Sequence, residues 1–105
     1  MGFLNALYAK YGIILDEEIL HGTEGVNGLA VGRDGKPPIV ALKPGMGNHQ
    51  KQFVMAHEMG HVLMGHLDAR LGTLGDTRCE SEANMFAAAL LAVALVTGRL
   101  GEEAE

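Results

Sequence analysis

The first forty residues alternate between apolar and polar positions in a way that predicts one helix followed by short extended segments. Residues 3–11 have helical periodicity, which predicts a short amphipathic helix ending at Gly12. The apolar positions of this helix are Phe3, Leu4, Leu7, Tyr8 and Tyr11. Residues 13–15 form a short apolar run that fits either a strand or a packed turn. Residues 16–21 are ambiguous, and the glycine-rich residues 22–28 are expected to form a loop.

Two apolar runs, residues 29–31 and 39–42, have the length and composition of short β-strands. Asp34-Gly35 lies between them, and this dipeptide is a strong signal for the turn of a β-hairpin. Pro37 and Pro38 open the second run, where the missing amide donor matters least. The pattern therefore predicts a small antiparallel hairpin ahead of the next helix.

Two longer helices are expected in the second half of the chain. The first follows Asn48, a suitable N-cap residue, and should run from about residue 49 to residue 66 or 67. The second should span residues 78–97, with Gly98 as its C-terminal cap. Its later part is rich in alanine and leucine, so the preceding helix can approach it closely.

The order of elements indicates an α+β domain, a small antiparallel sheet packed against two long helices, with residues 1–105 as a single domain. The apolar run 85–96 is too short to span a bilayer and is interpreted as a core helix. A net charge of −5 argues against binding to nucleic acid or to an anionic membrane. One cysteine and no convincing signal peptide favour a reducing compartment, so the cytoplasm is the expected location.

The segment His57-Glu58-Met59-Gly60-His61 has the pattern H-E-x-x-H. On a helix, residues four apart lie on the same face, so His57 and His61 can both point at one metal ion. Glu58 lies about 100° round the helix, where it can act as a general base on a bound water. Apolar residues flank the motif on both sides, and burying two histidines and a carboxylate is costly unless they hold a metal. We therefore predict that the motif binds zinc, one ion per chain, and do not regard the pattern as a chance occurrence.

A catalytic zinc usually has three protein ligands, so a further ligand is needed. His66 lies about 140° round the helix from His61 and is unsuited to the same ion. Glu80 and Glu82 are the remaining candidates, and Glu80 is favoured because Asn84 shares its helix face. Asn84 could then accept the ring N–H of a ligating histidine and fix the tautomer of that histidine.

Glu80 could instead cap its helix, because Thr77 and Glu80 have the spacing of a capping box, in which the Glu80 side chain bonds the Thr77 backbone N–H. A closed structural zinc site is a further alternative, for which Cys79 is the nearest spare ligand. Cys79 neighbours Glu80, however, and should point about 100° away from it. The metal-ligand role is preferred for Glu80 because two histidines alone would bind zinc poorly.

Two blocks of this sequence resemble the ImmA/IrrE family of zinc metallopeptidases. The first block is residues 53–66, around the H-E-x-x-H motif, and the second is residues 80–91, beginning Glu-Ser-Glu-Ala-Asn. The resemblance implies that His57, His61 and Glu80 hold zinc, that Glu58 is the catalytic base, and that the fold is a minimal zincin. The family commonly continues with Met-Pro and further helices after the second block, whereas this chain continues Ala92-Val93.

The resemblance further implies a protein substrate, a cytoplasmic helix-turn-helix repressor, which the chain would cleave as an endopeptidase. The alternative is a zinc-binding module that binds a regulator without cleaving it, although an intact Glu58 counts against it. The donor that would stabilise the oxyanion stays open among His49, His66, Tyr8 and Tyr11. The oligomeric state is not predicted.

Overall fold

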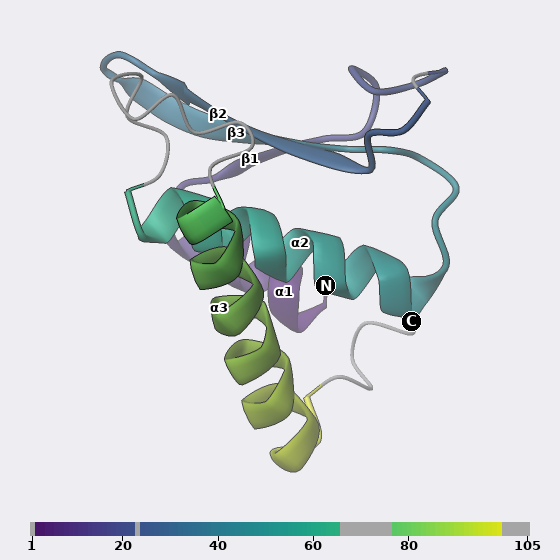
Figure 1. The fold of residues 1–105 in the computed structure, drawn as a ribbon, viewed down its shortest axis with the longest axis vertical. Helices are drawn as coiled ribbons and strands as arrows, with labels where there is room; N and C mark the ends of the chain where they lie inside the picture. The colour runs from purple at the N-terminus through teal and green to yellow at the C-terminus, as the bar shows by residue number, and fades with distance from the viewer. Residues whose placement is uncertain (1, 23, 66–76, 100–105) are drawn as a thin grey trace.

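The fold is α+β, as predicted, and the part of the chain that the structure describes has a three-stranded sheet on one side and three helices on the other (Figure 1). The computed structural model describes residues 2–22, 24–65 and 77–99. The elements, in chain order, are α1 (Phe3–Lys10), β1 (Ile14–Asp16), β2 (Gly28–Arg33), β3 (Lys36–Leu42), α2 (Asn48–Leu63) and α3 (Thr77–Val96).

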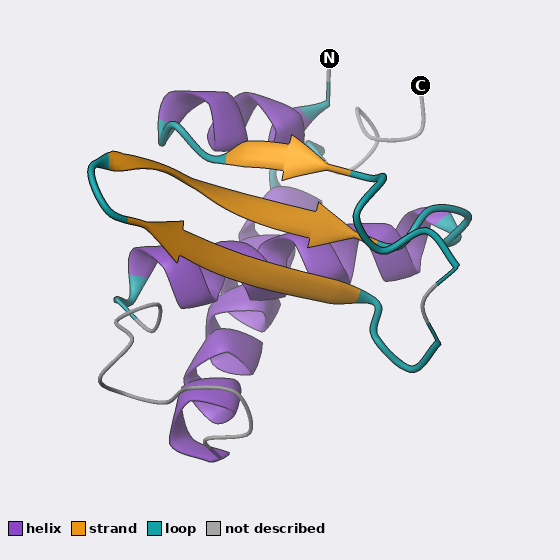
Figure 2. Cartoon of the chain, turned by 90° about the horizontal axis from the view of Figure 1, so that it is seen from above, coloured by secondary structure: helices purple, strands orange, loops and turns teal. Residues whose placement is uncertain are grey.

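The predicted antiparallel hairpin is present as β2 and β3, and Gly35 adopts a φ of +66° in its turn. The apolar run at residues 13–15 contributes a strand, because β1 pairs with β3. That pairing is parallel, so the sheet is mixed and has the order β1-β3-β2, in place of the purely antiparallel sheet expected. β3 is therefore the central strand, and β2 forms one edge (Figure 2).

The core lies between the sheet, α1 and α2. Its buried residues come from all three parts and are Leu4, Tyr8, Ile13, Val40, Leu42, Met55 and Met59. The Tyr8 hydroxyl donates a hydrogen bond of 2.6 Å to the backbone carbonyl of Met55, which ties α1 to α2. The two buried methionines of α2 thus fill the core beneath β3.

The two long helices begin and end close to the predicted residues, with two differences in α2. Gly47 is the N-cap of α2 and no side chain caps it, so the prediction of Asn48 as the cap is wrong; Asn48 is the first helical residue. α2 ends at Leu63, and Gly65 follows with a φ of +76°, a conformation that favours glycine and stops the helix. The predicted end at residue 66 or 67 is therefore too late.

α3 ends at Val96, one residue before the predicted end, and Gly98 follows with a φ of +76°, as expected for a residue that caps a helix. The Gly98 N–H donates to the Leu95 carbonyl at 3.1 Å, and the Arg99 N–H donates to the Ala94 carbonyl at 2.7 Å. These bonds satisfy carbonyls that the end of a helix leaves without partners.

α3 packs on α2 through its first half and extends beyond it (Figure 1). One face of α3 is buried, through Cys79, Ala83, Ala87 and Ala94. The interpretation of residues 85–96 as a core helix holds only for that face, because Met85, Val93, Leu95 and Val96 are all 60% or more exposed. Among the described residues, α3 is the one helix whose length and composition would allow it to cross a membrane, and 22% of its apolar window is buried.

Candidate metal centre

The candidate site lies where the second half of α2 meets the first half of α3. His57 and His61 are one turn apart on α2, and their rings meet edge to face with centroids 4.7 Å apart. Glu80 comes from the first turn of α3. The ligand atoms of these three side chains all lie within 4.8 Å of one another. The structure thus brings together the two motif histidines and the glutamate that the sequence favoured.

The spacing of the donor atoms fits a tetrahedral metal ion. The two histidine Nε2 atoms are 3.1 Å apart, and the Glu80 carboxylate oxygens lie 3.3 Å from His57 Nε2 and 2.8 Å from His61 Nε2. Ligands about 2.0–2.1 Å from a tetrahedral zinc are about 3.3 Å from one another. Two imidazole nitrogens and one carboxylate are also a ligand set that zinc accepts in catalytic sites, where a fourth position stays open. These residues therefore fit zinc in both geometry and chemistry.

Asn84 holds the ring of His57 in place. Its Oδ1 lies 2.8 Å from His57 Nδ1. An amide oxygen only accepts hydrogen bonds, so His57 Nδ1 is the donor in this contact, and Nε2 is the ring nitrogen that faces Glu80 and His61. A metal-ligating histidine usually has such an acceptor on its other nitrogen, which fixes the tautomer and raises the basicity of the ligand.

The position of Glu80 distinguishes between its two possible roles. Both of its carboxylate oxygens face the histidines, at 2.8 and 3.3 Å. Thr77, the expected N-cap of a capping box, is instead the first helical residue of α3. Neither Glu82 nor Cys79 belongs to the group of candidate ligands among the described residues. The geometry therefore favours Glu80 as a ligand over its role as a cap.

Glu58 is a buried carboxyl group beside the three candidate ligands. Only 7% of this residue is exposed, and burial, followed by the nearby charge of Glu80, raises the pKa of Glu58 to about 7. General bases in enzymes commonly have a pKa near the pH at which they work. This carboxyl group is therefore suited to accept and return a proton near neutral pH.

Two glycines shape the site, and the sequence pattern did not single out either of them. A Cβ on Gly28, at the start of β2, would lie 3.1 Å from Glu58 Oε2 and 2.5 Å from Val54 Cγ1. A Cβ on Gly60 would lie 3.1 Å from the Phe86 ring and 3.2 Å from the Ala83 Cα. Gly28 thus lets the edge strand lie against Glu58, and Gly60 lets α3 come close to α2.

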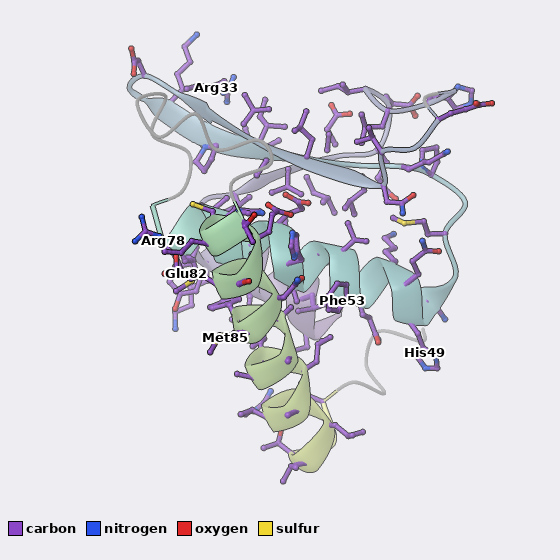
Figure 3. All side chains as sticks on the ribbon, viewed as in Figure 1. Arg33, His49, Phe53, Arg78, Glu82 and Met85 are labelled. Atoms are coloured by element: carbon purple, nitrogen blue, oxygen red, sulfur yellow. The ribbon has the colours of Figure 1, made fainter. Side chains whose placement is uncertain are left out.

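The four candidates for the oxyanion donor lie in different places. The hydroxyl of Tyr8 is buried and donates to Met55, and burial together with the charge of Glu58 raises its pKa, so Tyr8 serves the core instead. Tyr11 is half exposed at the end of α1. His49 is exposed on the first turn of α2, two turns before His57, and lies at the far end of the helix (Figure 3). His66 lies outside the described residues.

The exposed ring of Phe53 lies beside His57, with the two centroids 6.0 Å apart. Phe53 is 42% exposed and one turn before His57 on α2. An apolar side chain therefore borders the candidate site on the side toward the start of α2.

The model of one known protein family matches this chain. That family is described as the IrrE N-terminal-like domain, Peptidase_M78, and the match covers residues 19–92. These residues include all of β2, β3 and α2 and the part of α3 that carries Glu80 and Asn84. No curated protein and no solved structure matches the chain.

Proposed function

Because the chain belongs to the IrrE N-terminal-like family of peptidases, we propose that it is a zinc-dependent endopeptidase that cleaves a specific cytoplasmic protein. The observation that carries this proposal is the grouping of His57, His61 and Glu80 within 4.8 Å, with the buried carboxyl group of Glu58 beside it. The resemblance to the ImmA/IrrE family is confirmed by the family match, and the peptidase name of that family supports the proposed activity. The proposal adds three points to the family assignment: that the metal is zinc, that the substrate is one specific protein, and that both are in the cytoplasm.

His57, His61 and Glu80 would hold the zinc ion, and Asn84 would keep His57 in the tautomer that binds through Nε2. Zinc in such a site supplies a Lewis acid that polarises a peptide carbonyl and makes water more acidic. Glu80 is the most accessible of the three, with 45% of its side chain exposed against 13% for His57 and 10% for His61. We therefore expect a peptide to approach the site from the side of α3.

Glu58 is the proton carrier in this proposal. Its carboxylate takes a proton from the attacking water as the new bond to the peptide carbonyl forms. The same carboxyl group then returns the proton to the leaving amine as the C–N bond breaks. The burial of Glu58 supports this double role, because burial raises the pKa of the carboxyl group and so makes its carboxylate a stronger base than an exposed one.

The edge strand β2 is the element best placed to hold an extended substrate. It pairs only with β3 among the described residues, and it begins at Gly28, against Glu58. An extended peptide can add to such an edge through main-chain hydrogen bonds. The peptide bond would then lie across the site between β2 and α3.

The substrate class we propose is a helix-turn-helix repressor, as the family resemblance implies. The chain is small, and much of it forms the core and the site, so few residues remain for reading a long stretch of substrate. Cleavage should therefore depend on the folded surface of one partner, and general digestion of unfolded proteins is not expected.

The test is to mix the zinc-loaded protein with the repressor encoded nearest to its gene and to analyse the products by mass spectrometry. One defined cut that requires zinc supports the proposal. Tight, zinc-dependent binding without any cut would instead support a binding module that does not cleave its partner. Glu58→Gln serves as the matched control, because it should bind the repressor and leave it intact.

A further inference from the structure

The second half of α3 exposes a continuous apolar face. Met85, Val93 and Val96 are 72%, 60% and 85% exposed, and the alanines at positions 88, 89 and 92 are exposed between them. No charged residue occurs from residue 83 to residue 98. Figure 3 shows Met85 on the outer flank of α3, on the side of the helix away from Phe53. An exposed apolar surface of this kind marks an interaction site in soluble proteins.

The spacing of this face matches one seam of an antiparallel helix pair. Met85, Ala89, Ala92 and Val96 follow one another at intervals of four, three and four residues, as the core positions of a coiled coil do. The series is symmetric in side-chain size, because the larger residues Met85 and Val96 lie at its ends and the two alanines lie in the middle. A two-fold axis between residues 90 and 91 would therefore place Met85 opposite Val96, and Ala89 opposite Ala92. A surface that complements itself in this way suits a two-fold dimer.

A shallow apolar hollow lies where the two-fold pairing would bring a large side chain. The hollow has a volume of about 250 Å³ and is lined by Ala92, Val93, Val96 and Thr97. The hydroxyl of Thr97 turns away from it and donates to the backbone carbonyl of Val93 at 2.8 Å. The partner's Met85 would lie over this hollow, and its flexible side chain is suited to fill an irregular gap.

We propose that two copies of this chain associate through antiparallel packing of their α3 helices, with Met85, Ala89, Ala92 and Val96 as the seam. The two alanines allow the helix axes to approach to about 8 Å. A membrane surface is the less favoured occupant, because membrane binding would not require the symmetry of the seam. It would also be aided by basic residues near the apolar face, and none lies between residues 83 and 98. Glu80 lies about 150° round the helix from the seam, so the pairing leaves the metal centre open.

The first test is the molar mass of the zinc-loaded protein by light scattering or sedimentation equilibrium at micromolar concentration. The wild type should have a mass of about 22 kDa, twice the 11.1 kDa of one chain. Ala89→Glu should reduce this to the mass of one chain, because it buries a charge in the middle of the seam. Ile19→Glu is the matched control: Ile19 is 59% exposed and outside α3, so this variant should remain a dimer.

Zinc content measured on both variants checks that the fold and the metal centre are intact. A wild type that remains a monomer would overturn the proposal, as would an Ala89→Glu variant that binds zinc and still forms a dimer. A monomer that sediments with lipid vesicles through α3 would assign the face to a membrane, which would also overturn it.

The second test examines the direction of the pairing by disulfide formation. Met85→Cys and Val96→Cys are made separately, and each is oxidised alone and as an equal mixture. The antiparallel seam predicts covalent dimers in the mixture that join position 85 to position 96. Neither variant alone should cross-link efficiently, because residues 85 and 96 are separated by about 16 Å along a helix. Efficient cross-linking of either variant with itself would indicate a parallel pairing and contradict the proposed seam.

Discussion

Gly60 of α2 and Ala83 of α3 lie so close together that a Cβ on Gly60 would come within 3.2 Å of the Ala83 Cα. Gly60 lies within the H-E-x-x-H motif, immediately before His61, and Ala83 lies three residues after Glu80. This contact therefore sets how close the carboxylate of Glu80 comes to the two histidines. The candidate metal centre therefore depends on a helix crossing as much as on the three side chains that would bind the ion.

A larger residue at position 60 should disturb the metal centre from inside the helix interface. Gly60→Leu would push α3 away from α2 and carry Glu80 with it, because the obstructing atoms belong to the Ala83 backbone and Phe86. We expect zinc affinity to fall at least about tenfold, a change similar to the loss of a supporting residue around a metal ligand. Competition with a chromogenic chelator measures it. Gln50→Leu, on an exposed turn of the same helix, is the control and should bind zinc as the wild type does.

The two glutamates of α3 should differ sharply in their effect on zinc binding. Glu80→Ala removes a carboxylate that lies 2.8 Å from His61 Nε2, so it should weaken zinc binding by more than the roughly ten- to hundredfold typical of outer residues. Glu82→Ala should leave zinc affinity unchanged, because Glu82 is not part of the ligand group. The same chelator competition compares both variants. Normal zinc binding by Glu80→Ala would remove Glu80 from the ligand set.

The raised pKa of Glu58 predicts how the stability of the metal-free protein depends on pH. The pKa rises from 4.5 to about 7 on folding, so the folded state binds the proton more tightly than the unfolded state does. The free energy of unfolding should therefore fall as pH rises from about 4.5 to 7, by up to about 3 kcal/mol from this group. Urea unfolding of the metal-free wild type and of Glu58→Gln at pH 5 and pH 8 measures the difference. An equal pH dependence in both proteins would contradict the buried position of Glu58.

Glu58→Gln also separates metal binding from catalysis. The amide has nearly the shape of the carboxylate but cannot accept a proton from water, so the variant should keep one zinc ion and lose cleavage. General acid–base catalysis typically contributes about 10²–10⁴-fold to a rate, and we expect a loss in this range or greater. Parallel zinc analysis and cleavage of the repressor substrate provide the measurement. A variant that cleaves normally would show that another group carries the proton.

Local patterns along the chain were enough to predict much of this site. Residues four apart on one helix face place His57 with His61 and Glu80 with Asn84, so two pairs could be recognised before the helices were placed relative to each other. The distance between these pairs was not predictable, because it depends on the contact between Gly60 and Ala83. The position of Gly28 against Glu58 was not predictable for the same reason, since it joins two elements through space.

The differences in the fold also arise from non-local or competing interactions. The parallel pairing of β1 with β3 joins residues 14–16 to residues 39–41, and no local pattern determines that direction. α2 ends at Leu63 because Gly65 takes a left-handed conformation, although the helical periodicity continues beyond it. The apolar residues of α3 suggested a buried helix, but an apolar sequence does not reveal whether another part of the same chain covers it.

The most direct test of the metal centre is an anomalous difference map from crystals of the zinc-loaded protein, recorded at the zinc absorption edge. We predict one strong peak per chain, about 2.0–2.2 Å from His57 Nε2, from His61 Nε2 and from an oxygen of Glu80. Glu58 should lie close to this peak without binding it directly. A peak bound by Glu58 or Glu82 in place of Glu80, or no peak between the two histidines, would show that His57, His61 and Glu80 do not form the metal site.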